Sequence, residues 1–315
     1  FGGVRDVSGA LARAGRGAML QPLELLEVAD LLRVSRALFD YSKIDKPFET
    51  VLDETFSLIV TNRRLEDTIT RSILAEDQIA DEASSELAEM TVVSEEEVAD
   101  TASVALAAIR RKIRAANNKI KDTLQKFISG GYGKLLQENI VTMRNDRYVV
   151  PVKVEHRNEI KGLVHDTSAS GATVFIEPVS IVEANNELKL LKSREEHEIE
   201  KILYALSSLC AEAADTLNSN YHLITEIAFA FTCASLAEQM KASAVLPAKT
   251  KAFNLRRAVH PLLDRATAVP IDVRLGDDFD TLVITGPNTG GKTVTLKTAG
   301  LFALMYQSGL QLPSR

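Results

Sequence analysis

The chain has 315 residues, enough for two or three domains, with 45% hydrophobic and 25% charged residues. Its formal net charge of −6 excludes a chain that is basic throughout, so any nucleic-acid contact must lie on a local basic patch. Two isolated cysteines, Cys210 and Cys233, form no metal-ligand cluster and indicate a reducing cytoplasm, and no stretch has the character of a signal peptide or a bilayer-spanning run.

Residues 1–93 are predicted to form a helical core. The sequence contains no Trp and only 5% aromatic residues, which favours a core of aliphatic side chains packed between helices. The whole chain is predicted to be mainly α, with a small β insert, and to continue into the start of an α/β domain.

Residues 94–138 are predicted to contain one long helix. Ser94 and Glu97 form a capping-box pattern at its start, and Gly130-Gly131 predicts its end. From Ser94 such a helix is roughly 50 Å long, more than a compact domain usually contains. Its apolar stripe consists of Leu106, Ile109, Ile113, Ala116, Ile120, Leu124 and Phe127.

The same helix carries many cations for an acidic chain. Arg110, Arg111, Arg114 and Lys121 are candidate nucleic-acid contacts, because an acidic protein must bind a phosphate backbone through a local basic stripe. The alternative is an ordinary solvated helix face. The full stripe is Arg110, Arg111, Lys112, Arg114, Lys119, Lys121 and Lys126.

Residues 139–178 are predicted to form the β insert. Residues 139–153 are rich in β-branched side chains, and Pro151 among them predicts a sheet edge or a strand end, because proline has no N–H. Residues 162–178 predict a strand, a small polar loop and a second strand.

Four polar residues of this insert could suggest a hydrolase triad. However, the insert has no G-x-S-x-G elbow, and neighbouring side chains on a strand point to opposite faces. We therefore expect a structural turn network instead of catalysis. The four residues are His165, Asp166, Ser168 and Ser170.

Residues 179–250 are predicted to form a second long helix and the return to the core. The two long helices that flank the insert predict an antiparallel, hairpin-like arm, with an ordinary helical bundle as the alternative. Residues 227–236 form a dense apolar run and predict a buried helix. The apolar stripe of the second long helix is Leu188, Leu191, Ile199, Ile202, Leu206 and Leu209.

Residues 251–315 are predicted to be the N-terminal part of the P-loop domain. The motif G-x-x-x-x-G-K-[ST] is preceded by residues 281–285, which predict a buried parallel strand. It is followed by Val294, Leu296, Leu301, Leu304 and Met305, which recur at helical spacing. The motif itself is Gly286-Pro287-Asn288-Thr289-Gly290-Gly291-Lys292-Thr293.

This motif predicts a site for a nucleoside triphosphate with Mg²⁺. Glycines let the backbone pass close to phosphate, and the N–H groups of the loop and of the helix start point at the anion. Lys292 and Thr293 are the predicted catalytic residues, because the lysine is expected to contact the β- and γ-phosphates and the threonine hydroxyl to bind Mg²⁺. The whole motif is predicted to bind the nucleotide.

The position of the motif predicts that the chain is an internal part of a longer protein. A P-loop fold needs a later strand with an acidic residue for Mg²⁺, and little sequence follows the motif. The chain also begins at Phe1 and not at Met. We therefore expect a truncated ATPase domain that does not turn over by itself.

Three runs resemble the MutS family, and within it the bacterial paralogue branch called MutS-two. They are the glycine motif with residues 283–285 before it, residues 145–153 and residues 164–178. Residues 257–263 resemble the entry into that family's ATPase domain. The resemblance extends from Phe1 to Leu310.

The resemblance implies a cytoplasmic, homodimeric ATPase with core, lever and clamp-like helices, which binds ATP and Mg²⁺ and no membrane. It also implies binding to branched or duplex DNA, suppression of recombination and, for some members, a role at stalled ribosomes through ribosomal RNA. The family's endonuclease activity belongs to a C-terminal domain, so no nuclease residue is assigned here. The Phe-x-Glu that mismatch-correcting members use as a wedge is not transferred to residues 175–177, which lie mid-chain.

Two alternatives from other classes remain. One is a helical ATPase of the SMC or Rad50-like kind, but there the P-loop precedes the long helices, whereas here it follows them. The other is a helical binding module without turnover. Measurements of nucleotide binding separate such a module from an ATPase.

Overall fold

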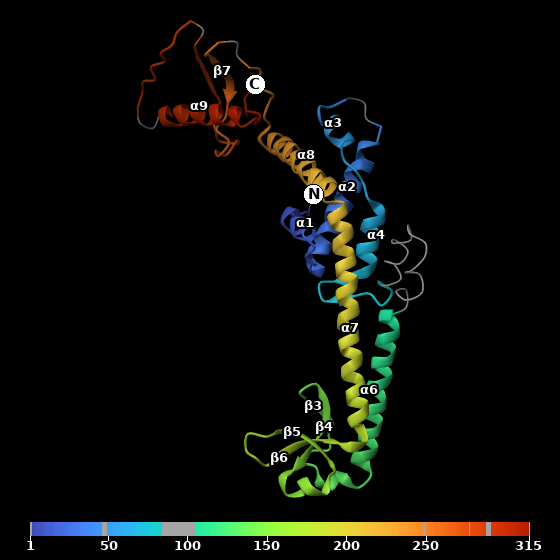
Figure 1. Cartoon of the computed structure of the whole chain (residues 1–315). Helices are drawn as coiled ribbons and strands as arrows, with labels where there is room; N and C mark the ends of the chain where they lie inside the picture. The colour runs from blue at the N-terminus through green and yellow to red at the C-terminus, as the bar shows by residue number, and fades with distance from the viewer. Residues whose placement is uncertain are drawn as a thin grey trace, which may run out of the picture. The chain divides into compact units, whose positions relative to one another are not determined.

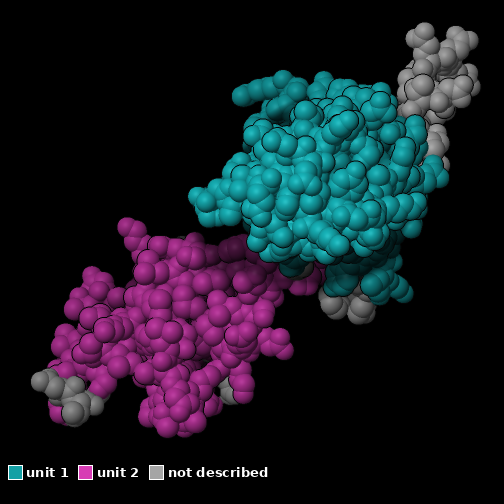
Figure 2. Space-filling model, turned by 90° about the horizontal axis from the view of Figure 1, so that it is seen from below, with its two compact units in different colours: residues 1–49, 56–221 teal, residues 50–55, 222–315 magenta. Residues whose placement is uncertain are grey.

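The computed structural model describes residues 2–45, 49–83, 105–247, 250–276, 278–287 and 291–314 (Figure 1). These residues form two compact units, residues 1–49 with 56–221 and residues 50–55 with 222–315 (Figure 2). Helices predominate, and the sheets are small and antiparallel. The predicted mainly α chain with a small β insert is therefore confirmed, while the five-part division of the chain stays a prediction.

The N-terminal part of the first unit is a helical bundle on one end of α7. Helix α2 begins at Pro22, where Gln21 and Glu24 form a reciprocal capping box, and α4 begins after Asn62, whose side chain accepts a hydrogen bond from Leu65 N–H at 3.0 Å. The elements of this part are α1 (Ser8–Ala14), α2 (Pro22–Ser42), α4 (Arg63–Ser72), β1 (Ile73–Ala75) and β2 (Gln78–Ile79). The short helix α3 (Leu52–Ser57) belongs to the second unit up to Thr55.

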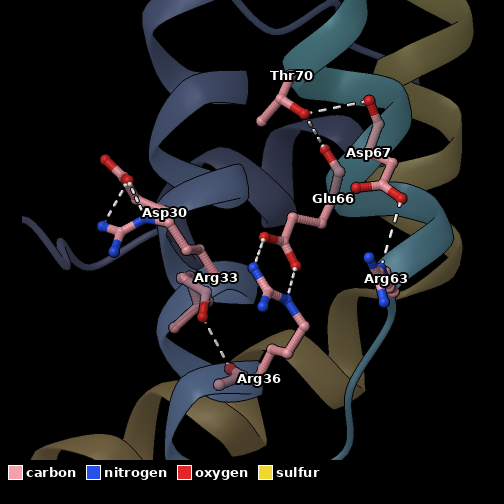
Figure 3. Close-up of polar contacts among 9 residues, drawn as sticks. Asp30, Arg33, Arg36, Arg63, Glu66, Asp67 and Thr70 are labelled. Atoms are coloured by element: carbon pink, nitrogen blue, oxygen red, sulfur yellow. Dashed lines mark hydrogen bonds and ion pairs between the residues drawn. The ribbon is translucent and has the colours of Figure 1, made fainter.

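A partly buried ion pair joins α2 to α4 in this bundle (Figure 3). Arg36 donates two hydrogen bonds, at 2.9 and 2.8 Å, to the two carboxylate oxygens of Glu66, which is only 5% exposed. The hydrogen bonds that Arg36 donates to Glu66, and the negative charge of Glu66, raise the pKa of Arg36 above its usual value. Arg33 and Asp30 form a second, exposed pair on α2. The paired charges fix how the two helices lie against each other.

The two predicted long helices are present and run antiparallel (Figure 1). They are α6 (Ala105–Ser129) and α7 (Val179–Glu212). Helix α6 ends where the glycine pair predicts, with Gly131 in the left-handed region at φ 108°. The predicted start at Ser94 and Glu97 lies outside the described residues.

The two apolar stripes, which we expect to pack on each other in an antiparallel arm, do so over part of α7. Ala116, Ile120 and Leu124 of α6 do share a buried cluster with Leu188 and Leu191 of α7. Farther along, α7 packs against the N-terminal bundle, and Ser207 Oγ accepts a hydrogen bond from Leu20 N–H at 2.8 Å. The apolar stripe of α7 therefore packs against both α6 and the N-terminal bundle, because α7 extends beyond Ala105, the first described residue of α6.

The β insert forms a four-stranded antiparallel sheet in the order β3-β4-β6-β5. Its inner face packs against α6 and α7 through Val150, Val152, Val174 and Ile176. This arrangement places the insert at the end of the arm remote from the bundle (Figure 1). The elements are β3 (Thr142–Arg144), β4 (Arg147–Lys153), β5 (Gly162–Thr167) and β6 (Thr173–Pro178), with short 3-10 turns at Tyr132–Leu135 and Val154–Glu159.

Pro151 does not lie at a sheet edge or a strand end, so that prediction is wrong. It lies inside β4, an interior strand, opposite Phe175 of β6. Its carbonyl oxygen accepts from Gln137 N–H at 2.9 Å, on the side away from β6. In an extended strand the N–H and C=O of one residue face the same side, and β3 pairs with β4 only as far as Val149. The backbone nitrogen of Pro151, which has no hydrogen to donate, therefore lies on the side of β4 where β3 has already ended.

A buried carboxylate connects the sheet to α7. Glu177 of β6 is fully buried and accepts hydrogen bonds from Arg147 of β4 at 2.9 and 3.1 Å and from Asn185 of α7 at 2.8 Å. His165 Nε2 of β5 lies 2.5 Å from the same carboxylate. Three strands and one helix thus meet at a single charged side chain.

The second unit contains the end of α8 (Ala214–Met240), the antiparallel pair β7 (Phe253–Ala258) and β8 (Ile271–Leu275), and α9 (Lys292–Gln307). Its buried cluster joins Leu255 and Ala258 to Phe302, Met305 and Leu312.

The apolar run at residues 227–236 lies in α8, so the predicted helix is confirmed, but the prediction that it is buried is wrong. Ile227 is buried, whereas Phe229 is 62% and Phe231 40% exposed. A helix that packs on one side only leaves its other apolar side chains in solvent, whatever its composition.

We predict that Glu177→Ala destabilises the first unit. Removing one partner leaves the buried guanidinium of Arg147 without its counter-charge, which costs about 3–5 kcal/mol in typical buried pairs. Urea unfolding followed by circular dichroism measures the change. Glu155→Ala, at an exposed glutamate on the same part of the chain, is the control and should change stability by less than about 0.5 kcal/mol. Equal effects of the two changes would contradict this role for Glu177.

Candidate nucleotide site and basic helix face

The glycine motif leads directly into α9. Gly286 has φ 139° and Gly291 has φ 79°, values that side-chain-bearing residues rarely adopt. Gly291 caps α9, and Thr295 N–H makes the first helical hydrogen bond to its carbonyl oxygen at 2.9 Å. Asn288, Thr289 and Gly290 lie outside the described residues. The loop and the helix start thus have the backbone conformation that the motif predicts at both ends.

The residues at this helix start fit a phosphate group. The N–H groups of Lys292, Thr293 and Val294 precede the first helical hydrogen bond, and the helix dipole adds partial positive charge there. Lys292 Nζ lies 2.5 Å from the carbonyl oxygen of Gly286, so the ammonium group folds back across the loop. Thr293 is exposed at the same end. If ATP and Mg²⁺ bind here, these groups are the ones that would hold them.

The strand predicted before the motif is not formed. Residues 281–285 belong to no strand, and Leu282, Val283 and Ile284 are 45%, 76% and 41% exposed. A parallel strand needs neighbours that satisfy its backbone hydrogen bonds. In the described part of the second unit the sheet consists of β7 and β8, and residues 281–285 are not paired with it.

The apolar residues that recur after the motif lie in a helix, α9, as predicted, but only some of them are buried. Phe302 and Met305 are buried against β7, whereas Leu296 and Leu304 are 72% and 62% exposed. The apolar residues thus lie on two sides of α9, and the described residues of the chain cover only one of these sides.

The basic stripe of α6 lies largely in solvent. Ala116, Ile120 and Leu124 face the core, and the cations lie on the rest of the helix surface. Arg114 makes a weak ion pair with Asp81 at 3.9 Å and keeps 62% of its side chain exposed. The exposed members are Arg111, Lys112, Arg114, Lys119, Lys121 and Lys126.

Arg110 differs from the rest of the stripe. Its guanidinium donates to Asp81 Oδ1 at 2.6 Å, to the carbonyl oxygen of Ile79 at 2.7 Å and to Glu195 Oε1 of α7 at 2.7 Å. Burial lowers the pKa of Arg110, but the hydrogen bonds and charges of Asp81 and Glu195 outweigh it and raise the pKa above its usual value. Arg110 therefore joins α6 to α7 and to the segment after β2, and it is not an exposed cation.

The polar residues of the β insert form a turn network, as predicted. Ser168 Oγ accepts from Thr173 N–H at 3.0 Å and lies 3.3 Å from Ser170 Oγ, while Asp166 Oδ1 accepts from Thr167 N–H at 2.8 Å. His165 contacts Glu177 and neither serine. The sequence analysis missed Glu177 as the centre of a buried network, although an acidic residue directly after the apolar run Val174-Phe175-Ile176 was a usable sign.

The cysteines and carboxylates provide no further site in the described part of the chain. Burial raises the pKa of Cys210 to about 12, so its thiol stays protonated, and Cys233 is half-buried. No group of three or more His, Cys, Asp or Glu side chains is placed there to hold a metal ion. No helix among the described residues is both long and apolar enough to cross a membrane.

Comparison with known proteins gives one consistent answer. Proteins named Endonuclease MutS2 are 46% identical to this chain over 318 residues in Acetivibrio thermocellus, 44% over 317 residues in Ruminiclostridium cellulolyticum and 42% over 316 residues in Clostridioides difficile. The chain belongs to the MutS2 family. No protein-family model matches it.

The alignments include 99–100% of the chain but 38% of each of these MutS2 proteins. The chain thus spans well under half the length of the relatives it matches, and the resemblance to the MutS-two branch is confirmed along its whole length. In this MutS2 chain the Phe-x-Glu at residues 175–177 is structural, because Glu177 is buried and Phe175 lies under the guanidinium of Arg144, 4.1 Å from it.

We predict that replacing two neighbouring arginines of α6 by alanine affects the stability of the protein differently. Arg110→Ala removes three hydrogen bonds and takes away the guanidinium that Asp81 and Glu195 share, which should lower the free energy of unfolding by about 1–3 kcal/mol. Arg111→Ala removes an exposed cation and should change it by less than about 0.5 kcal/mol. Thermal and urea unfolding measure both. A neutral Arg110→Ala would show that the contacts with Asp81 and Glu195 do not stabilise the arm.

Proposed function

We propose that this chain is the core, arm and nucleotide-loop part of a MutS2-type ATPase that binds nucleic acid. The observation that carries the proposal is Gly291, which caps α9, with the ammonium group of Lys292 beside the carbonyl oxygen of Gly286 and the N–H groups of the first helical turn next to them. Lys292 and Thr293 are the proposed catalytic residues, and residues 286–293 the proposed site for ATP with Mg²⁺. The proposal for the nucleotide rests on this geometry and on the family.

The arm supports the nucleic-acid part of the proposal. Arg111, Arg114 and Lys121 are exposed on a helix held rigidly by its contacts with α7, in a chain of net charge −6. The proposed partner is branched or duplex DNA, with ribosomal RNA as the further candidate that the family suggests. We assign suppression of recombination, handling of stalled ribosomes and homodimer formation to the full-length protein. We assign none of these 315 residues to the endonuclease activity for which the relatives are named.

One observation favours a second candidate, a helical binding module that does not turn over ATP by itself. Residues 281–285 belong to no strand, so the loop lacks the parallel sheet that normally holds it. Nucleotide binding and turnover can therefore be separated by experiment.

We predict that the loop lysine and threonine control ATP turnover in the full-length protein. Lys292→Ala removes a charge-assisted contact with phosphate and should weaken ATP binding about 10–100-fold. Thr293→Ala removes the hydroxyl that is proposed to bind Mg²⁺ and should cripple ATP turnover. A malachite-green phosphate assay and isothermal titration measure the two effects. The 315-residue chain alone should show no steady-state hydrolysis, and turnover that disappears in its Lys292→Ala variant would contradict that expectation.

We predict that reversing three exposed cations of α6 weakens nucleic-acid binding by the full-length protein. Arg111→Glu, Arg114→Glu and Lys121→Glu together should lower the affinity at least about tenfold and reduce the salt slope by about 3, roughly one unit for each lost phosphate contact. Fluorescence anisotropy with branched and duplex DNA at several salt concentrations measures both. The matched control reverses Lys189, Arg194 and Lys201 of α7. An equal loss of affinity in the control would show that the effect depends only on net charge, and it would contradict α6 as the contact.

A further inference from the structure

The outer face of the β7–β8 hairpin gathers arginines that the sequence analysis did not single out. Leu255 and Val273 are cross-strand partners and are both buried, so they face the core of the second unit. Asn254 and Arg274 are the next pair and are exposed. Because side chains alternate along a strand, this second pair marks the solvent face of the hairpin.

A β-bulge brings two consecutive arginines to that solvent face. Between the pairs Leu255–Val273 and Ala258–Ile271, β7 has two residues, Arg256 and Arg257, whereas β8 has one, Asp272. Both arginines are exposed. In a regular strand one of them would point to the buried side, so the extra residue is what places both guanidinium groups in solvent.

The backbone at the bulge is held in an unusual conformation. Arg257 has φ 49°, in the left-handed region that long side chains rarely adopt. Its N–H donates to Asp272 Oδ1 at 2.6 Å, which fixes the bulge from the opposite strand. Residues in such conformations concentrate at functional sites, because the surrounding structure must hold them there.

The bulge borders an open cavity of about 540 Å³ with an excess of positive charge. Asn254, Arg256, Arg257, Asp272 and Arg274 contribute its polar side chains. Arg256 and Arg257 have no ion-pair partner in the described part of the chain, whereas Arg274 lies 3.3 Å from Asp278. Two arginines without an ion-pair partner among the described residues thus border one cavity, although the chain as a whole has a net charge of −6.

We propose that this bulge is a binding site for a phosphate group. A guanidinium is a planar fork of donors that matches two phosphate oxygens at once, and Asn254 adds a neutral amide donor at the rim. The phosphate belongs either to a free anion or to a nucleic-acid backbone, since both present the same oxygens. The site shares no residue with the glycine loop, so it goes beyond the proposed nucleotide function.

The test follows arginine Nε–H signals of the 315-residue chain by NMR, at low salt, during a titration with inorganic phosphate. The background carries Lys292→Ala, which removes the loop lysine as a competing phosphate contact. Saturable shifts of the Arg256 and Arg257 signals are expected, and Arg256→Gln with Arg257→Gln should weaken phosphate binding at least about tenfold. Asp272→Asn keeps an oxygen for the Arg257 N–H but removes a negative charge, so it should tighten binding.

A charge-matched control and a second probe complete the test. Arg16→Gln with Lys189→Gln removes the same charge from the first unit and should leave phosphate binding unchanged. A single-stranded oligonucleotide that competes with phosphate identifies a nucleic-acid backbone as the source, and shifts with inorganic phosphate alone identify a free anion. The absence of saturable shifts at Arg256 and Arg257, or an equal loss in the control, would overturn the proposal. ATP binding to the chain with an intact Lys292 is measured separately, so failure of this site is distinguishable from failure of the nucleotide loop.

Discussion

The arm of this protein depends on one buried carboxylate. Glu177 has no exposed surface, and a charge in that position is tolerated only when donors surround it. Arg147, His165 and Asn185 supply those donors from β4, β5 and α7. Asn185 also exchanges hydrogen bonds with the backbone of Tyr148, at 3.2 and 3.1 Å. Since such contacts are directional, they fix the orientation of the sheet on the helix, which apolar packing alone would leave less specific.

A second set of charges fixes the other end of α6. Arg110 joins it to Glu195 of α7 and to Asp81, while Arg36 and Glu66 join α2 to α4 in the neighbouring bundle. The same residue type thus has two roles along one helix. Arg110 is enclosed by acceptors and stabilises the arm, whereas Arg111, one residue later, points to solvent and is available to a ligand.

The second unit has two features suited to phosphate, and both use left-handed backbone. At the glycine loop, Gly291 has no side chain and adopts φ 79° without strain. At the β7 bulge, Arg257 adopts φ 49° with a long side chain, and a carboxylate on the opposite strand holds it there. The first feature can be recognised from residue types alone, while the second depends on a strand register that those types do not encode.

The sequence by itself determined the helices, the glycine motif and the family. Periodic apolar residues, Gly130-Gly131 and Pro178 predicted where α6 ends and α7 begins, because helix periodicity and caps are local properties. Tertiary structure decided which neighbours cover each face. Pro151 is accommodated in an interior strand because β3 ends before it, and residues 281–285 form no strand because none of the described strands pairs with them. Arg110 forms ion pairs because Asp81 and Glu195, which are remote in sequence, lie beside it in the fold. Such pairings depend on which segments meet in space, and that information is not contained in any local pattern.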